Sequence, residues 1–127
     1  MPFSLSPRSK LSLSRAHPDL RRVIERAIEI TEIDFVVTEV MRTSAKQKQL
    51  FAAGASKTMR SRHLTGHAAD VAALVGGKVR WDWPLYAKIA QAVKQAAAEL
   101  GVPIEWGGDW KSFKDGPHFQ LPWKGYP

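Results

Sequence analysis

The sequence contains no cysteine anywhere in its 127 residues. Disulfides therefore cannot hold the fold together, and a small domain without them depends on its hydrophobic core. Hydrophobic residues make up 44% of the chain, which is enough for such a core and excludes wholesale disorder. The lack of thiols also excludes Cys-ligated zinc fingers and thiol catalysis. Any metal site must then use His, Asp and Glu.

The length predicts one domain over residues 1–127. No apolar run reaches the roughly 20 residues of a membrane-spanning helix, so we expect no stable membrane insertion. The N-terminal stretch lacks a continuous apolar segment, which argues against a secretory signal. Residues 1–16 are rich in Ser and Pro, and we expect them to form an irregular arm.

Hydrophobic spacing predicts an α+β fold with a small antiparallel sheet flanked by helices. Proline and glycine mark where several of the elements begin and end. Helices are predicted over residues 18–30, 45–53 and 84–100, strands over 34–41, 102–106 and 118–121, and a glycine-turned hairpin over 70–81.

Positive charge is concentrated in one part of the chain, whose formal net charge is +7. The segment from Arg42 to Arg62 contains six basic residues and no acidic one. Such a segment favours an anionic partner, which could be nucleic acid, an acidic lipid surface or an acidic polymer such as the bacterial cell wall. The alternative is a solvated loop without a partner.

Two polar segments are not explained by folding alone: SRHLTGHAAD at 61–70, and the stretch from EWGGDW to DGPHFQ at 105–120. Imidazole and carboxylate together suit Zn²⁺, and three protein ligands with an open position are typical of a catalytic site. His63, Asp70 and His118 can supply two nitrogens and one oxygen. Asp115, three residues before His118, could stand beside the metal as a general base.

Other assignments of these polar residues remain open on spacing alone. His63 and His67 are four residues apart, as in HExxH zinc peptidases, but Gly66 disfavours the helix which that motif requires. We therefore interpret His67 as a non-ligand. Asp70 could instead cap a turn, and Asp109 after two glycines is more typical of such a cap.

These motifs resemble the LAS-type zinc peptidases. That group includes D-Ala-D-Ala dipeptidases and carboxypeptidases, phage endolysin L-alanyl-D-glutamate endopeptidases and the zinc fold of hedgehog signalling domains. The pattern SxHxxGxAxD stands here as SRHLTGHAAD, and the later D/E-x-x-H stands as DGPH. The segments HPDLRRVIERAIEI, EVMRT, QKQLF and EWGGDW extend the resemblance over residues 3–122. EWGGDW and the aspartate of DGPH are most similar to the endolysin branch.

The resemblance implies a zinc site with three protein ligands, which are His63, Asp70 and His118. It implies that Asp115 is the catalytic acid/base and that Arg42 faces the substrate carbonyl. The implied reaction is metal-assisted amide hydrolysis, in which Asp115 takes a proton from water and delivers it to the leaving amine. The roles of Ser61 and Trp106, in the pocket or in the fold, remain open.

The implied function is that of a zinc-dependent endolysin, which hydrolyses the L-Ala–D-Glu bond of the peptidoglycan stem and causes host cell lysis. In that bond the leaving D-Glu keeps its α-carboxylate, which Arg42 and its basic neighbours could pair. The expected partner is peptidoglycan and not nucleic acid, and the expected state is a monomer without a separate cell-wall-binding domain. The enzyme would stay in the host cytoplasm until its release to the periplasm and cell wall at lysis.

Two alternatives belong to other functional classes. A D-Ala-D-Ala carboxypeptidase of cell-wall metabolism would work in the periplasm, so the missing signal peptide disfavours it. A basic binding module with a relic zinc site would have no need of a base, so the presence of Asp115 disfavours that reading.

Overall fold

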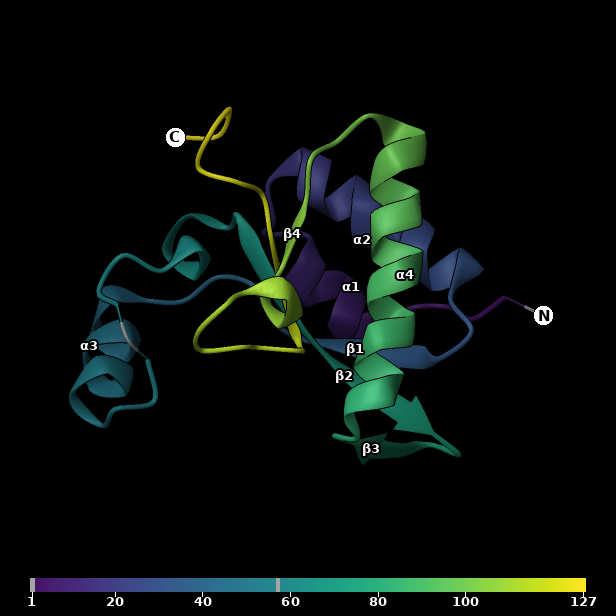
Figure 1. The fold of residues 1–127 in the computed structure, drawn as a ribbon, viewed down its shortest axis with the longest axis horizontal. Coiled ribbons are helices and arrows are strands. Elements are labelled where there is room, and N and C mark those ends of the chain that lie inside the picture. The colour runs from purple at the N-terminus through teal and green to yellow at the C-terminus, as the bar shows by residue number, and fades with distance from the viewer. Residues whose placement is uncertain (1, 57) are drawn as a thin grey trace.

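The computed structural model describes residues 2–56 and 58–127, so Lys57 of the basic segment lies outside the described residues. The α+β architecture with a small antiparallel sheet is confirmed (Figure 1). The helices are α1 (Pro7–Leu13), α2 (Pro18–Ile30), α3 (Ser44–Ala52) and α4 (Trp83–Leu100), with short 3-10 helices η1 (Arg62–Thr65) and η2 (Gly107–Asp109). The strands are β1 (Asp34–Glu39), β2 (Ala68–Val75), β3 (Lys78–Arg80), β4 (Glu105–Trp106) and β5 (His118–Gln120).

The sheet has the strand order β1-β2-β5-β4, and β3 forms a hairpin with the far end of β2. Successive side chains of a strand point to opposite faces. Ala69, Val71 and Ala73 of β2 belong to the hydrophobic core, which α1, α2 and α4 share. Asp70 therefore lies on the opposite face of the sheet. This alternation separates a core face from a polar face.

Helices α2 and α4 pack against each other over the core face. The predicted apolar positions of α2 are all buried, and its predicted bounds are confirmed. In Figure 1, α3 lies apart from these helices, and the loop between η2 and β5 extends to the same side of the molecule. Among the described helices, none combines the length and hydropathy that crossing a membrane requires.

The expectation of an irregular arm over residues 1–16 is wrong, because residues 7–13 form α1. Ser6 caps this helix by accepting a hydrogen bond from the Ser9 backbone N–H at 3.1 Å, and Pro7 occupies the first turn. The buried Ser9 hydroxyl in turn accepts from the Val37 N–H of β1 at 2.9 Å. A helix of seven residues is too short for a clear apolar period, and packing on β1 stabilises it.

Smaller differences concern element ends. Strand β1 stops at Glu39 instead of residue 41, after a register irregularity between Val37 and Glu39. The strand predicted over 102–106 shrinks to β4, and the helix predicted over 45–53 begins one residue earlier, after the Thr43 cap. The hairpin turn falls at Gly76 and Gly77 as predicted, and both have the positive φ that such a turn needs.

Candidate active site

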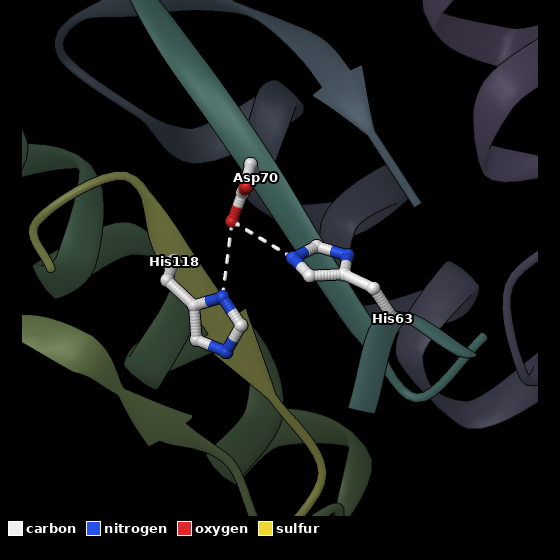
Figure 2. A group of neighbouring side chains, drawn as sticks. All are labelled: His63, Asp70 and His118. Atoms are coloured by element: carbon white, nitrogen blue, oxygen red, sulfur yellow. Dashed lines mark hydrogen bonds and ion pairs between the residues drawn. The ribbon is translucent and has the colours of Figure 1, made fainter. Parts of the chain in front are cut away.

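Three side chains that could hold a metal ion converge on the polar side of the sheet (Figure 2). Asp70 of β2 and His118 of β5 are direct cross-strand partners, so their side chains leave the same face together. His63 comes from η1, immediately before β2. One ligand atom from each residue lies within 4.8 Å of the other two. The structure thus brings together the three residues that the sequence predicts as ligands.

Gly66 is required where η1 turns into β2. It ends η1 with φ 74°, a left-handed conformation that favours glycine. A Cβ at this position would lie 2.7 Å from the backbone oxygen of Arg15, closer than real Cβ contacts come. This close turn lets His63 lie beside Asp70 although seven positions separate them in the sequence. It explains the glycine of the SRHLTGHAAD motif.

The tautomer of His63 follows from its backbone partner. Its Nδ1 lies 2.9 Å from the carbonyl oxygen of Val40, which can only accept a hydrogen bond. Nδ1 therefore carries the proton, and Nε2 keeps its lone pair. Nε2 is buried without a hydrogen-bond partner among the described residues, and lies 3.2 Å from Asp70 Oδ1. A cation in the middle of the group would satisfy this orphaned nitrogen.

The tautomer of His118 follows from a chain of two side chains. Gln120 Nε2 donates to Glu105 Oε2 at 3.3 Å, which turns the amide oxygen of Gln120 toward His118 Nε2 at 2.8 Å. His118 Nε2 must then be the donor, so a neutral ring keeps its lone pair on Nδ1. Nδ1 lies 3.0 Å from Asp70 Oδ1. Both imidazoles are thus oriented by their outer nitrogens, as metal-binding histidines commonly are.

The charges at this group favour a cation. Burial by itself raises the pKa of Asp70, but the hydrogen bond with His118 and the nearby His63 outweigh it, and the pKa lies well below its usual range. Burial lowers the pKa of His118, but its hydrogen bond and charge interaction with Asp70 raise it on balance. The group therefore attracts positive charge, and a divalent ion can replace the proton.

Asp115 lies on the loop before β5 and is held there by the EWGG segment. The Asp115 backbone N–H donates to the Gly107 carbonyl at 3.0 Å, and Trp106 Nε1–H donates to the Gly116 carbonyl at 2.7 Å. A Cβ at Gly107 would lie 2.3 Å from the Asp115 backbone oxygen and 3.0 Å from its Cβ. Gly107 is thus the residue that permits this approach. Trp106 is buried, and its role here is structural.

The carboxyl of Asp115 is half-buried and has a raised pKa. Burial is the largest cause, and the negative charge of Asp70 adds to it, against smaller opposing effects of His118, His63 and Arg42. A carboxyl with a raised pKa is better matched to exchanging protons near neutral pH than an exposed one. The raised pKa of Asp115 therefore suits a group that accepts and donates protons.

Arg42 is held in place by two side chains that sequence reasoning did not single out. Its guanidinium donates from Nε and Nη2 to Glu39 Oε1, and from Nη1 to Gln47 Oε1 at 2.8 Å. Gln47 is fully buried and also binds the Ser56 hydroxyl and the Thr58 carbonyl. Arg42 is thereby fixed between β1 and α3 with its charge balanced by Glu39.

All five predicted site residues line one cleft of about 1000 Å³. One wall comes from α3 and the segment leading to η1, the other from residues 110–115, and the three candidate metal ligands lie between them. Ser61 also lines the cleft, and its hydroxyl accepts from the His63 backbone N–H at 3.2 Å. Trp110 contributes an aromatic ring 5.2 Å from the ring of His118.

His67 and Asp109 lie outside the lining of this cleft. His67 Nδ1 contacts the Thr65 hydroxyl at 2.7 Å, and its ring packs near the rings of His17 and Tyr126. Asp109 forms an ion pair with Lys94 at 2.6 Å.

Gln120 and Glu105 are two further residues near the site that sequence reasoning missed, in addition to Glu39 and Gln47. Gln120 follows His118 by two positions in a strand, which places both on one face, and Glu105 is its cross-strand partner in β4. The strand alternation could have identified Gln120. Glu105 could not be found this way, because its approach depends on the pairing of β4 with β5.

Comparison with known proteins gives a consistent result. A family model described as phage L-alanyl-D-glutamate peptidase matches residues 1–121. The L-alanyl-D-glutamate peptidase of Escherichia phage T5 is 34% identical over 119 residues, which cover 91% of this chain and 87% of that protein. The L-alanyl-D-glutamate peptidase of Listeria phage A118 is 40% identical over 98 residues, which cover 77% of this chain and 34% of that protein.

The structural comparison extends to a crystal structure. The L-Ala D-Glu endopeptidase ChiX of Serratia marcescens has 52% sequence identity and a TM-score of 0.92, with 95% of this chain and 91% of that chain covered. The resemblance inferred from the motifs is therefore confirmed. The chain belongs to the phage L-alanyl-D-glutamate peptidase family.

Proposed function

We propose that this chain is a zinc-dependent endopeptidase that hydrolyses the L-Ala–D-Glu bond of the peptidoglycan stem. The observation that carries the proposal is the convergence of three potential ligand atoms, from His63, Asp70 and His118, at the floor of a wide cleft. Family membership supports a peptidase, and the relatives described above are all named for cleavage between L-Ala and D-Glu.

Zinc is the metal that this donor set suits best. Two imidazole nitrogens and one carboxylate oxygen, with a fourth position open to the cleft, form the usual catalytic zinc arrangement. A bound zinc ion would supply Lewis acidity toward the peptide carbonyl and the attacking water. The buried and orphaned Nε2 of His63 supports the presence of such an ion.

The protein's own groups supply the proton transfers and the orientation. Asp115 accepts a proton from the attacking water and then delivers it to the leaving nitrogen of D-Glu. Arg42 has committed three of its five N–H groups to Glu39 and Gln47, and Ser61 Oγ lies 3.5 Å from Nη1. The second N–H on Nη2 of Arg42 can stabilise negative charge on the peptide oxygen.

The biological role that fits this chemistry is lysis of a bacterial host by a phage or prophage. The chain would act as a monomer on peptidoglycan, after its release from the host cytoplasm. The D-Ala-D-Ala carboxypeptidase alternative receives no support from the names of the relatives, and a basic binding module would not need the Asp115 loop geometry.

Mass spectrometry of digested peptidoglycan tests the bond. We expect stem peptides that begin with a free D-Glu amine, with L-Ala left on the muramic acid. Free D-Ala as the main product, without new Glu amines, would contradict the endopeptidase assignment and support the carboxypeptidase.

Metal removal tests the cofactor. We expect about one zinc per chain, loss of wall hydrolysis in a strong chelator, and recovery when zinc is added back. Binding should weaken as the pH falls through roughly 6 to 5, because both imidazoles must be neutral to bind the ion. Protein with less than half an equivalent of metal and unchanged lysis in chelator would refute a zinc enzyme.

A further inference from the structure

The cleft is lined by five described basic residues, and two of them are already committed to contacts within the protein. Arg42 is balanced by Glu39. Arg62 is buried, and its guanidinium donates to the backbone oxygens of Leu121, Pro122 and Tyr126 while it packs over the ring of Trp123. Both guanidinium groups therefore already have partners within the protein, and neither can serve as the main partner of a substrate carboxylate.

The other three basic residues of the cleft, Lys46, Arg60 and Lys114, are exposed. No ion pair among the described residues involves them. Lys46 on α3 and Arg60 before η1 belong to one wall, and Lys114 belongs to the loop of the other wall. Arg60 is partly oriented, because its guanidinium lies 5.1 Å from the ring centre of Trp123.

The acidic residues that line the cleft do not offset these three cations. Glu39 is paired with Arg42, Asp70 lies between the two histidines, and Asp115 is half-buried on the loop before β5. The rim of the cleft therefore carries positive charge, and the three candidate metal ligands lie at its floor. Such a rim attracts an anionic group that sits next to the reacting bond.

We propose that Lys46, Arg60 and Lys114 form a subsite for the α-carboxylate of the D-Glu residue on the leaving side of the scissile bond. This inference rests on the proposed function. In the stem, D-Glu is linked onward through its γ-carboxyl, so its α-carboxylate stays free and is attached to the same carbon as the leaving nitrogen. Arg42, which the sequence suggested for this pairing, is left to face the carbonyl.

The subsite makes the enzyme selective against stems in which this carboxylate is amidated. An amide keeps the shape of the group and removes its charge, so the pairing with the rim is lost. Exposed ion pairs contribute modestly, about two- to fivefold each in binding, and three together give a measurable preference. The preference should appear mainly in KM, because the pairing is the same before and during bond cleavage.

The test uses two synthetic stem peptides that differ only in D-Glu or D-isoglutamine, with the zinc-loaded protein. We expect the wild type to cleave the acid with a kcat/KM about tenfold higher than the amide, at low salt. The triple variant Lys46→Met, Arg60→Met, Lys114→Met should lose this preference, so that the kcat/KM ratio of acid to amide falls from about tenfold to near one. Lys48→Met is the matched control, because Lys48 is exposed on the same helix α3 and does not line the cleft.

The outcomes of this test separate failure of the subsite from failure of the proposed function. A triple variant that keeps the full preference for the acid, or a wild type that cleaves both peptides equally well, overturns the subsite. Loss of preference in Lys48→Met would also overturn it, since general surface charge would then be the cause. If the wild type cleaves neither peptide at the L-Ala–D-Glu bond, the proposed function itself fails.

Discussion

Gln120 determines which nitrogen of His118 faces the metal group. Its amide oxygen accepts from His118 Nε2 at 2.8 Å, and Glu105 prevents the amide from turning over. His63 is oriented in the same manner by the Val40 carbonyl, but through the opposite ring nitrogen. A backbone carbonyl cannot be removed by mutation, so Gln120 is where this kind of support can be tested.

Replacing Gln120 by leucine should weaken zinc binding by about 10- to 100-fold, because His118 loses the acceptor that fixes its tautomer. Competition with a chromogenic chelator measures the affinity directly, independent of catalysis. Gln91→Leu, on the exposed face of α4, is the control and should bind zinc as the wild type does. Equal affinities for the two variants would mean that Gln120 only packs in the site.

Asp115→Asn should retain the zinc and the fold and lose turnover by about 10²- to 10⁴-fold, since an amide cannot accept and return the proton. Zinc content and thermal unfolding provide the comparison with the wild type. A variant with near-normal turnover would remove Asp115 from the proton transfers.

His67→Ala should keep both metal and most activity, because His67 lies outside the cleft lining.

At the scale of elements, the turn from β4 into η2 supports the loop that carries Asp115. Gly107 and Trp106 contact that loop through one backbone and one side-chain hydrogen bond. The three metal ligands, by contrast, come from β2, β5 and η1. Asp115 and the three candidate metal ligands are therefore held mainly by different segments, which meet where the His118 backbone N–H donates to the Asp115 carbonyl at 3.2 Å.

Gly107→Ala should lower kcat more than it lowers zinc affinity, because the new Cβ would displace the Asp115 backbone directly and His118 only through its N–H bond to the Asp115 carbonyl. Steady-state kinetics on a stem peptide and chelator competition give the two readouts. Trp106→Phe removes the hydrogen bond to the Gly116 carbonyl and part of a buried ring, and it should show the same pattern more weakly. Loss of zinc in step with loss of kcat would contradict this separation.

The elements differ in how far the sequence could predict them. Helix α2 could be predicted because its thirteen residues carry a clear apolar period, and the hairpin could be predicted from its two glycines. Helix α1 was missed, since seven residues show no period and depend on packing against β1. The group of His63, Asp70 and His118 could be predicted from its motif, and the structure brings the three side chains together. Glu105 and the Glu39–Arg42 pair depend on strand register and tertiary contacts that spacing does not encode.

At the scale of the whole molecule, the chain carries a net charge of +7, and only some of its basic residues line the cleft. Part of the basic segment 42–62 lines the cleft, while Lys48 of the same segment does not, and Lys57 lies outside the described residues. The charge therefore has a local part, at the rim, and a part that is distributed over the rest of the chain.

Hydrolysis of whole walls should fall with added salt more steeply than hydrolysis of a small stem peptide. Exposed charges are screened over about 10 Å at 0.1 M salt, and the polymer meets many more of them than a peptide does. Rates on both substrates between low and moderate salt check this, with circular dichroism to show that folding is unchanged. Parallel salt profiles would mean that the distributed charge does not contribute to wall binding.

The two faces of the sheet also constrain how this gene can change length. Asp70 of β2 and His118 of β5 lie next to core residues that point to the opposite face, so one inserted or deleted residue within either strand would turn these side chains over. Asp70 or His118 would then point into the core, and an apolar side chain would take its place in the cleft. Insertions and deletions that survive selection should therefore fall outside the paired strands, for instance in the exposed turn at Gly76 and Gly77 between β2 and β3. Such a turn can lengthen or shorten while the floor of the site stays the same.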